Sequence, residues 1–144
     1  MDKKYSKIED KISDLVKTYD ADLILYMLDE IAYFLKGIDY KLYKKILDYT
    51  GEEFQLNISQ IIPINNNNIS KKENPTNARR IIAVILTEQT TFDIQTISRL
   101  LKVTVRGVYS YINQFQYKMN NANYPHNKNF IDKYKAILNR INHE

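Results

Sequence analysis

Apolar residues recur at intervals of three and four through the first third of the chain, which is the spacing of one helical face. The repeat predicts three helices there, over residues 8–19, 21–36 and 40–50. We expect Gly37 and Gly51 to end the second and third helices, because glycine readily adopts the left-handed conformation that closes many helices. The second helix is apolar nearly all round and is therefore expected to lie between neighbouring elements.

The pattern changes after Glu52, where Phe54, Leu56 and Ile58 alternate with polar residues. This alternation fits either a short strand or an apolar loop laid across the helices, and it is too short to distinguish them. Residues 65–73 are polar and rich in asparagine. We therefore expect a linker between two parts of the chain there.

Helical spacing resumes in the second half of the chain. A helix is expected to begin at Asn74, whose side chain suits an N-cap, with Pro75 in the first helical position. Two shorter helices follow, and a last one begins near Asn127. The whole pattern predicts an all-α fold, in which a small helical N-terminal module precedes a bundle of three or four helices.

The two shorter helices are separated by only three residues. Apolar residues keep helical spacing over 94–101, stop at 102–104 and resume over 108–115. Asp93 and Thr104 are suitable N-caps for the two helices. The segment resembles the helix-turn-helix of bacterial DNA-binding proteins, in which the second helix enters the major groove. The resemblance implies that double-stranded DNA is the partner.

In such a motif, the side chains of the second helix that point away from the core contact base edges. Helical spacing gives this set as Val105, Arg106, Gly107, Tyr109, Ser110 and Asn113. Arg106 is the strongest candidate, because a guanidinium can donate two hydrogen bonds to O6 and N7 of guanine. Gly107 costs about 1 kcal/mol in a helix relative to alanine. Close approach of DNA explains it, and so does tolerance near a helix start.

A second set is expected to contact phosphates, which adds affinity without selecting a sequence. It consists of Arg79, Arg80, Thr91, Gln95, Thr96, Arg99, Lys102, Thr104 and Lys118. The charge distribution favours this assignment. Residues 1–64 carry nine lysines and twelve acids, a net charge of −3, whereas residues 65–144 carry twelve basic residues and five acids, a net charge of +7. A basic half of this kind is typical of a phosphate-binding domain joined to another part.

We therefore expect three parts. Residues 1–64 would form a helical interaction or dimerisation module, residues 65–73 a linker, and residues 74–144 the helix-turn-helix DNA-binding domain. The N-terminal helices would form a homodimer or bind a protein partner. Alternatively, they complete the core under the C-terminal helices.

The arginine-bearing segment Arg79–Leu86, followed by a short polar link and the two short helices, also resembles the C-terminal DNA-binding domain of DnaA-type replication initiators. In that family a further helix closes the domain, as residues 130–141 would do here. Lys102–Gly107 stands where the family has Gly-Gly-Arg-Asp-His-Thr-Thr. The family's target preference therefore does not carry over. The chain has no Gly-rich phosphate loop, so the initiator's ATPase activity is not expected.

Composition gives little support for catalysis, and we do not expect an enzyme. The absence of cysteine excludes disulfides and thiolate metal sites. His126 and His143 do not have the spacing of a helical metal pair. The adjacent carboxylates Asp29-Glu30 and Glu52-Glu53 point apart on a helix and form no acid/base pair by themselves. We accordingly expect no metal and no cofactor.

The chain also lacks the sequence features of secretion or membrane insertion. Residues 1–5 have no apolar core of a signal peptide, and the longest apolar stretch, Leu23–Leu35, is short and is interrupted by two acids. We expect a soluble cytoplasmic protein without a membrane partner.

These observations favour a DNA-binding regulator of transcription, or a replication-associated factor, of a bacterium, a phage or another mobile element. The alternative is a helical protein-interaction adaptor in which the same two helices pack internally, and it predicts that Arg106 and Tyr109 are occupied by intramolecular or subunit contacts. RNA binding is a third hypothesis. The 12 tyrosines and 5 phenylalanines can stack on bases, but most of them lie at core spacing.

Overall fold

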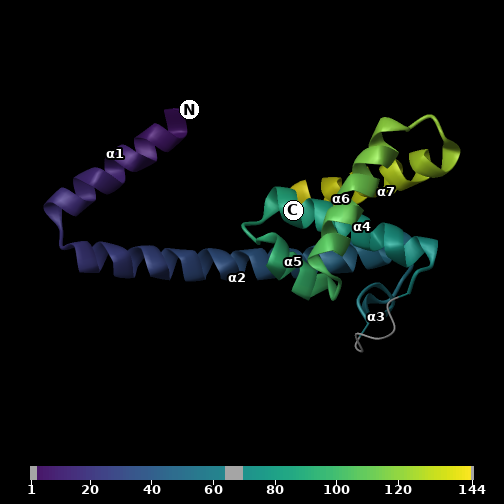
Figure 1. Ribbon diagram of the computed structural model, residues 1–144, viewed down its shortest axis with the longest axis horizontal. Coiled ribbons are helices and arrows are strands. Elements are labelled where there is room, and N and C mark those ends of the chain that lie inside the picture. The colour runs from purple at the N-terminus through teal and green to yellow at the C-terminus, as the bar shows by residue number, and fades with distance from the viewer. Residues whose placement is uncertain (1–2, 64–69, 144) are drawn as a thin grey trace. The chain divides into compact units, whose positions relative to one another are not determined.

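The computed structural model describes residues 3–63 and 70–143. All regular elements in this part of the chain are α-helices, as predicted (Figure 1). In chain order they are α1 (Lys3–Thr18), α2 (Ala21–Phe54), α3 (Ile58–Ile61), α4 (Glu73–Gln89), α5 (Ile94–Leu101), α6 (Val105–Asn120) and α7 (Pro125–Asn142).

The chain divides into two compact units, residues 1–38 and residues 39–144. The division falls within α2, and not in the asparagine-rich stretch expected as a linker. Most of that stretch, residues 65–69, lies outside the described residues. The second part of α2 belongs to the C-terminal unit because Ile46 and Phe54 are buried in its hydrophobic core.

The predicted helix ends at Gly37 and Gly51 are wrong, because α2 continues through both residues to Phe54. A Cβ at Gly37 would meet no atom within 4 Å, so nothing there requires a glycine. A Cβ at Gly51 would lie 2.8 Å from the carbonyl oxygen of Leu56. The Leu56 N–H donates to the Gly51 carbonyl at 2.8 Å, and the intervening Gln55 has a φ of 55°. Gly51 therefore lets the chain fold back closely over the end of the helix.

The segment after α2 contains a helical turn in place of the strand or loop expected there. The backbone N–H of Asn57 donates to Gln60 Oε1 at 2.8 Å, which stabilises the start of α3. Ile61 at the end of α3 is fully buried. The alternation of apolar residues in this segment thus reflects a helix end and one short helix.

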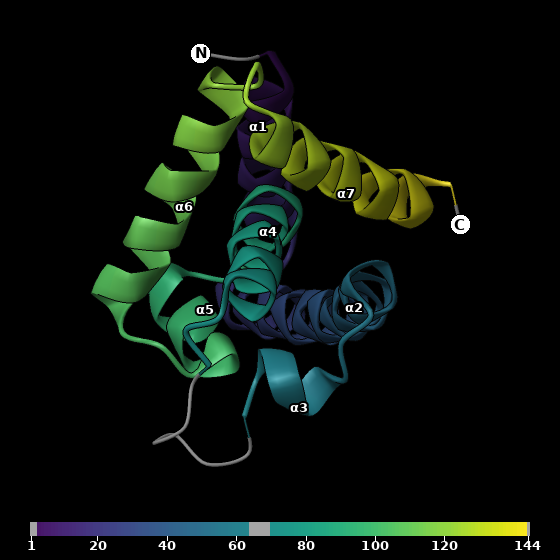
Figure 2. The ribbon, with the colours of Figure 1, turned by 90° about the vertical axis from the view of Figure 1, so that its right-hand side faces the viewer.

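Helix α4 forms the centre of the C-terminal unit. Six consecutive residues, 81–86, are buried, so the helix is covered on every side. Figure 2 shows α4 nearly end-on, with α3, α5, α6 and α7 around it. It begins at Glu73 and not at Asn74, which lies in the first turn and does not cap the helix. Pro75 is tolerated as the third helical residue because the first N–H groups of a helix have no partner within it.

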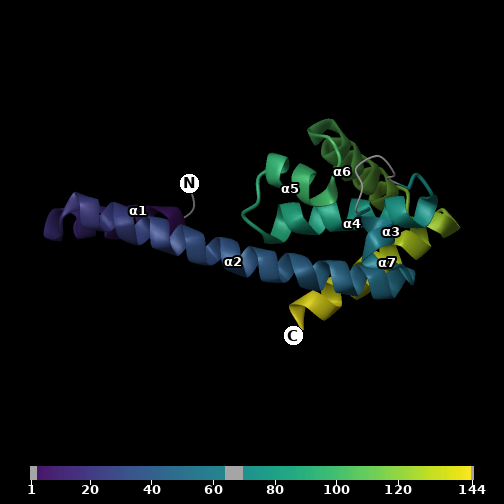
Figure 3. The same ribbon diagram turned by 90° about the horizontal axis from the view of Figure 1, so that it is seen from below.

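Helix α7 closes the unit against the end of α2 (Figure 3). The guanidinium of Arg140 lies 2.6 Å from Glu52 Oε2 and 4.0 Å from the ring centre of Tyr49. Lys133 Nζ donates to the Glu53 carbonyl at 3.0 Å. These contacts fix the helix that follows α6.

Candidate nucleic-acid interface

Helices α5 and α6 are joined by the three-residue turn 102–104, and both begin at the predicted caps. Asp93 accepts a hydrogen bond from the Thr96 N–H at 2.8 Å, and Thr104 Oγ1 accepts one from the Gly107 N–H at 3.0 Å. Both cap predictions are confirmed. The turn therefore sets where α6 begins.

The turn itself is held by two further hydrogen bonds. Lys102 adopts the left-handed conformation with φ 55° and ψ 41°. Ser98 Oγ donates to the Val103 carbonyl at 2.6 Å, and the Val103 N–H donates to the Ser98 carbonyl at 3.1 Å. Because these bonds close the end of α5, the geometry of the turn is well determined by its own residues.

Residues 39–54 of α2 hold α5 and the loop before it in place. Asp39 Oδ2 accepts from the Thr91 N–H at 3.0 Å and from the Thr91 hydroxyl at 2.6 Å, which holds the loop before α5. The hydroxyl of Tyr43 donates to the Leu100 carbonyl at 3.1 Å. Burial raises the pKa of Tyr43 to about 12. The expectation that Thr91 contacts phosphate is corrected, because both of its donors serve this internal contact.

Most of the residues expected to contact bases are exposed on α6. Val105 and Tyr109 are 38% and 53% exposed, and Arg106, Ser110 and Asn113 are exposed as well. Arg106, Tyr109, Ser110 and Asn113 follow the spacing of a single helical face. The opposite face is buried through Val108 and Phe115.

The side chain of Arg106 has no hydrogen bond or ion pair with any other residue in the described part of the chain. Its neighbour Gly107 is half-buried. A Cβ there would lie 3.3 Å from Thr104 Oγ1 and 3.4 Å from Val103 Cβ. The glycine therefore leaves room for the capping hydroxyl, an explanation that sequence reasoning missed.

The segment around these helices carries positive charge and no acid. From Ile94 to Ile131 there is no aspartate or glutamate, whereas the same stretch contains Arg99, Lys102, Arg106, Lys118 and Lys128. The net charges of residues 1–64 and 65–144 do not reveal this acid-free stretch, because each is summed over a whole half of the chain. An acid-free basic stretch of this length favours contact with a polyanion.

Five residues of the expected phosphate set lie on α5 and the adjoining turn. Gln95, Arg99 and Thr104 are exposed, and Thr96 and Lys102 are half-buried. The guanidinium of Arg99 lies 3.4 Å from Thr96 Oγ1. The structure thus brings Arg99 and Thr96 together on α5.

Arg79 was expected to hold the DNA backbone, and the structure contradicts this because the side chain is only 1% exposed. Its guanidinium donates to the Tyr111 hydroxyl at 2.9 Å, to the Ile61 carbonyl at 3.1 Å, and also to the Ser70 carbonyl and the Thr76 hydroxyl. A charged side chain is stable inside a protein when its donors are satisfied in this way. Arg79 is therefore a structural residue that connects α4 with α6 and with the end of α3.

Arg80 and Lys118, also in the phosphate set, are half-buried and have internal partners. Arg80 donates to Gln114 Oε1 at 2.6 Å and to Asn77 Oδ1 at 2.5 Å. Lys118 Nζ lies 3.4 Å from Asn127 Oδ1. Burial lowers the pKa of both cations, and for Lys118 repulsion from Arg80 lowers the pKa further. Both residues brace α6 against its neighbours.

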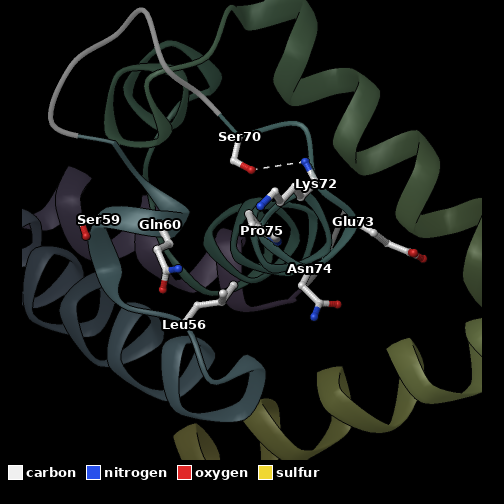
Figure 4. A pocket seen from close by; sticks show the side chains of 8 residues that line it. All are labelled: Leu56, Ser59, Gln60, Ser70, Lys72, Glu73, Asn74 and Pro75. Carbon is white, nitrogen blue, oxygen red and sulfur yellow. Dashed lines mark hydrogen bonds between the residues drawn. The ribbon is translucent and has the colours of Figure 1, made fainter.

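A pocket of about 630 Å³ opens at the start of α4, and Figure 4 shows the eight side chains that line it. Ser59 and Gln60 approach it from α3, whereas Lys72 and Pro75 lie at the N-terminal end of α4. The Lys72 N–H donates to Ser70 Oγ at 3.3 Å. The lining offers hydroxyl and amide groups together with one cation and one carboxylate, but no histidine or cysteine.

Comparison of the chain with models of known protein families, with characterised proteins and with solved structures gives no match. Within residues 3–63 and 70–143, no group of three His, Cys, Asp or Glu side chains can hold a metal ion. No helix in the same described ranges has the length and apolar character needed to cross a bilayer.

Proposed function

We propose that this protein binds double-stranded DNA, with α6 in the major groove and with α5 and the turn against the backbone. It would act as a regulator of transcription or as a replication-associated factor. The observation that carries the proposal is the exposed face of α6, where Arg106 has no partner among the described residues and lies in an acid-free segment. No cofactor and no catalytic step are required.

The dimensions of α6 suit this role. The exposed residues from Arg106 to Asn113 span about 10 Å along the helix axis, which is about three base-pair steps of DNA. Arg106 supplies two parallel donors for a guanine edge, and Asn113 can pair with adenine in the same bidentate manner. Tyr109, exposed between them, adds a hydroxyl and an apolar ring that can contact a thymine methyl group.

Phosphate contacts would come from the residues that surround the turn. Arg99 is exposed on α5, and Lys102 follows at its end. Thr104 uses its hydroxyl oxygen to accept from Gly107, and its hydroxyl proton stays able to donate to a phosphate oxygen. These groups would position α6 without selecting a sequence.

The adaptor hypothesis is the second candidate. It requires Arg106 and Tyr109 to be occupied by contacts within the chain or between subunits, and within the described chain both side chains are exposed. Their exposure supports DNA binding over internal packing of this helix. A homodimer or a protein partner is compatible with either function.

The first test is fluorescence anisotropy of a labelled random-sequence duplex at about 50 mM and about 200 mM salt. We expect micromolar binding that weakens steeply with salt. The double variant Arg99→Gln/Lys102→Asn should reduce the slope of log K against log salt by about 2, because each phosphate contact contributes about 0.9. Asparagine tolerates the left-handed backbone of position 102.

The matched control is Lys44→Gln/Lys135→Gln, which also removes two positive charges, from exposed positions of α2 and α7. It should leave the slope nearly unchanged. Absence of binding at low salt would contradict the proposal and direct attention to protein partners. Equal loss of slope in both double variants would indicate a diffuse charge effect and no defined interface.

Base recognition requires a selected target site. On that site Arg106→Ala should cost about 1–3 kcal/mol and relax the preference at one base pair. Arg106→Lys keeps the charge but loses the bidentate geometry, so it should recover affinity for random DNA without recovering the preference. Equal loss for Arg106→Ala on every sequence would remove its role in base recognition.

A further inference from the structure

The apolar side chains of residues 3–38 have little protein to cover them. Sixteen large apolar residues in this unit are between 37% and 79% exposed, and no residue of α1 is buried. Only six more such residues lie in the rest of the described chain. Short helices gain most of their stability from packing of an apolar face. This unit therefore needs a partner surface.

The apolar residues have the alternating three- and four-residue spacing of a coiled coil. α1 together with the residue after it carries one such seam: Tyr5, Ile8, Ile12, Leu15 and Tyr19. The first part of α2 carries two: Ile24, Met27, Ile31, Phe34 and Ile38, and beside it Ala21, Leu25, Leu28, Ala32 and Leu35. A helix with two seams can pack against two others, as in a four-helix bundle.

The space between the two helices of one copy is itself apolar and unfilled. A cavity of about 320 Å³ lies where the end of α1 meets the start of α2. It is lined by Leu15, Tyr19, Leu23, Ile24, Met27, Leu28 and Ile31. Most of these residues belong to the seams, so side chains of a partner helix with the same spacing would fill it.

The charges of α1 and of residues 20–35 indicate which partner can pack against these helices. α1 contains five lysines and three acids, whereas residues 20–35 contain four acids and no basic residue. The two helices of one copy thus have opposite net charges. A second copy presents both charges, so that α1 of one copy can lie against α2 of the other with opposite signs facing.

The extent of the surface agrees with a dimer. A standard interface uses about 20–30 residues on each side, and this unit of 38 residues supplies sixteen exposed large apolar ones. We propose that residues 3–38 pair with the same residues of a second copy and form a four-helix bundle. The proposal does not depend on DNA binding, because none of residues 3–38 belongs to the candidate interface.

Light scattering during gel filtration of the full chain, without DNA, tests the proposal. At micromolar concentration the wild type should have twice the mass of one chain. Leu28→Asp and Ile12→Asp place a carboxylate in a seam and should each raise the dimer dissociation constant at least about 100-fold. Tyr33→Asp makes a similar change at a position that is 79% exposed and outside both α2 seams, and it should leave the dimer intact.

Charge pairing between copies has its own test. Lys7→Glu/Lys11→Glu and Asp29→Lys/Glu30→Lys should each weaken the homodimer, because like charges then face each other across the bundle. Mixing the two variants should restore the dimer mass, since each supplies the sign that the other lacks. A mixture no more dimeric than its components would overturn the pairing of α1 with α2 of the second copy.

A monomeric wild type would overturn the proposal, and so would a seam variant that stays as dimeric as Tyr33→Asp. Circular dichroism shows whether each variant keeps the C-terminal unit folded. The salt-dependent anisotropy of the monomeric variants on a short random duplex then separates the two questions. A monomeric wild type that still binds DNA would count against the dimer alone, and a dimeric wild type that does not bind DNA would count against DNA binding alone.

Discussion

The two parts of α2 have similar apolar residues in different surroundings. Ile31, in the N-terminal unit, is 51% exposed, whereas Ile46, in the C-terminal unit, is fully buried. Both belong to one uninterrupted helix and both follow helical spacing. The difference teaches that periodicity identifies which side chains need burial, but not whether their own chain supplies it.

Replacing Ile46 or Ile31 by alanine should give the largest difference in the free energy of unfolding and in its dependence on protein concentration. Ile46→Ala creates a cavity in a closed core and should lower the free energy of unfolding by about 2–5 kcal/mol. This loss should not depend on protein concentration. The measurement is urea denaturation followed by circular dichroism, at two protein concentrations that differ about tenfold.

Ile31→Ala should behave differently because, in the proposed dimer, a second copy covers the exposed part of its side chain. Its effect should be visible where the dimer is populated and should shrink on dilution. A cost as large as that of Ile46→Ala at both concentrations would break the comparison. It would mean that the chain covers this part of α2 by itself.

Two arginines give the next contrast, inside the C-terminal unit. Arg79→Met removes the buried guanidinium and leaves acceptors without partners, including the Ile61 carbonyl, and should cost about 2–3 kcal/mol of stability. Arg106→Met changes an exposed side chain and should alter stability by less than about 0.5 kcal/mol. Thermal melts of both variants measure the difference. Comparable losses would mean that Arg106 also has a structural role.

Sequence reasoning found the helices and their caps where the causes are local. Asp93 and Thr104 lie just before an apolar repeat, and their side chains need reach only three residues ahead. The end of α2 was predicted wrongly because the helix continues through the exposed Gly37 into residues that are buried in the core of the C-terminal unit, such as Ile46 and Phe54.

The candidate site was harder to predict because exposure depends on distant residues. Helical spacing alone could not reveal that Arg79 meets Tyr111, 32 residues later in the chain. An arginine near a helix start next to an apolar stripe is more often exposed than buried. The positive charge of Arg79 therefore led to the prediction that it contacts a DNA phosphate. The acid-free stretch from Ile94 to Ile131 was available in the sequence and is the feature that would have sharpened the assignment.

The smallest expected difference in stability is between two tyrosine-to-phenylalanine variants of α2, at Tyr43 and at Tyr33. Burial raises the pKa of Tyr43 to about 12, above the value of about 10 expected in the unfolded chain. The stability that comes from the neutral phenol is therefore complete below pH 10 and is lost as the pH rises towards 12.

At pH 8, Tyr43→Phe should cost about 1 kcal/mol because it removes the hydrogen bond to Leu100. Between pH 10 and 12 this deficit should shrink, because the wild type loses stability that the variant does not have. Urea denaturation across this range measures it, and Tyr33→Phe, at an exposed position of the same helix, should show no such change. A constant deficit for Tyr43→Phe would mean that the phenol ionises equally in both states, and that this part of α2 is less well covered than Ile46 indicates.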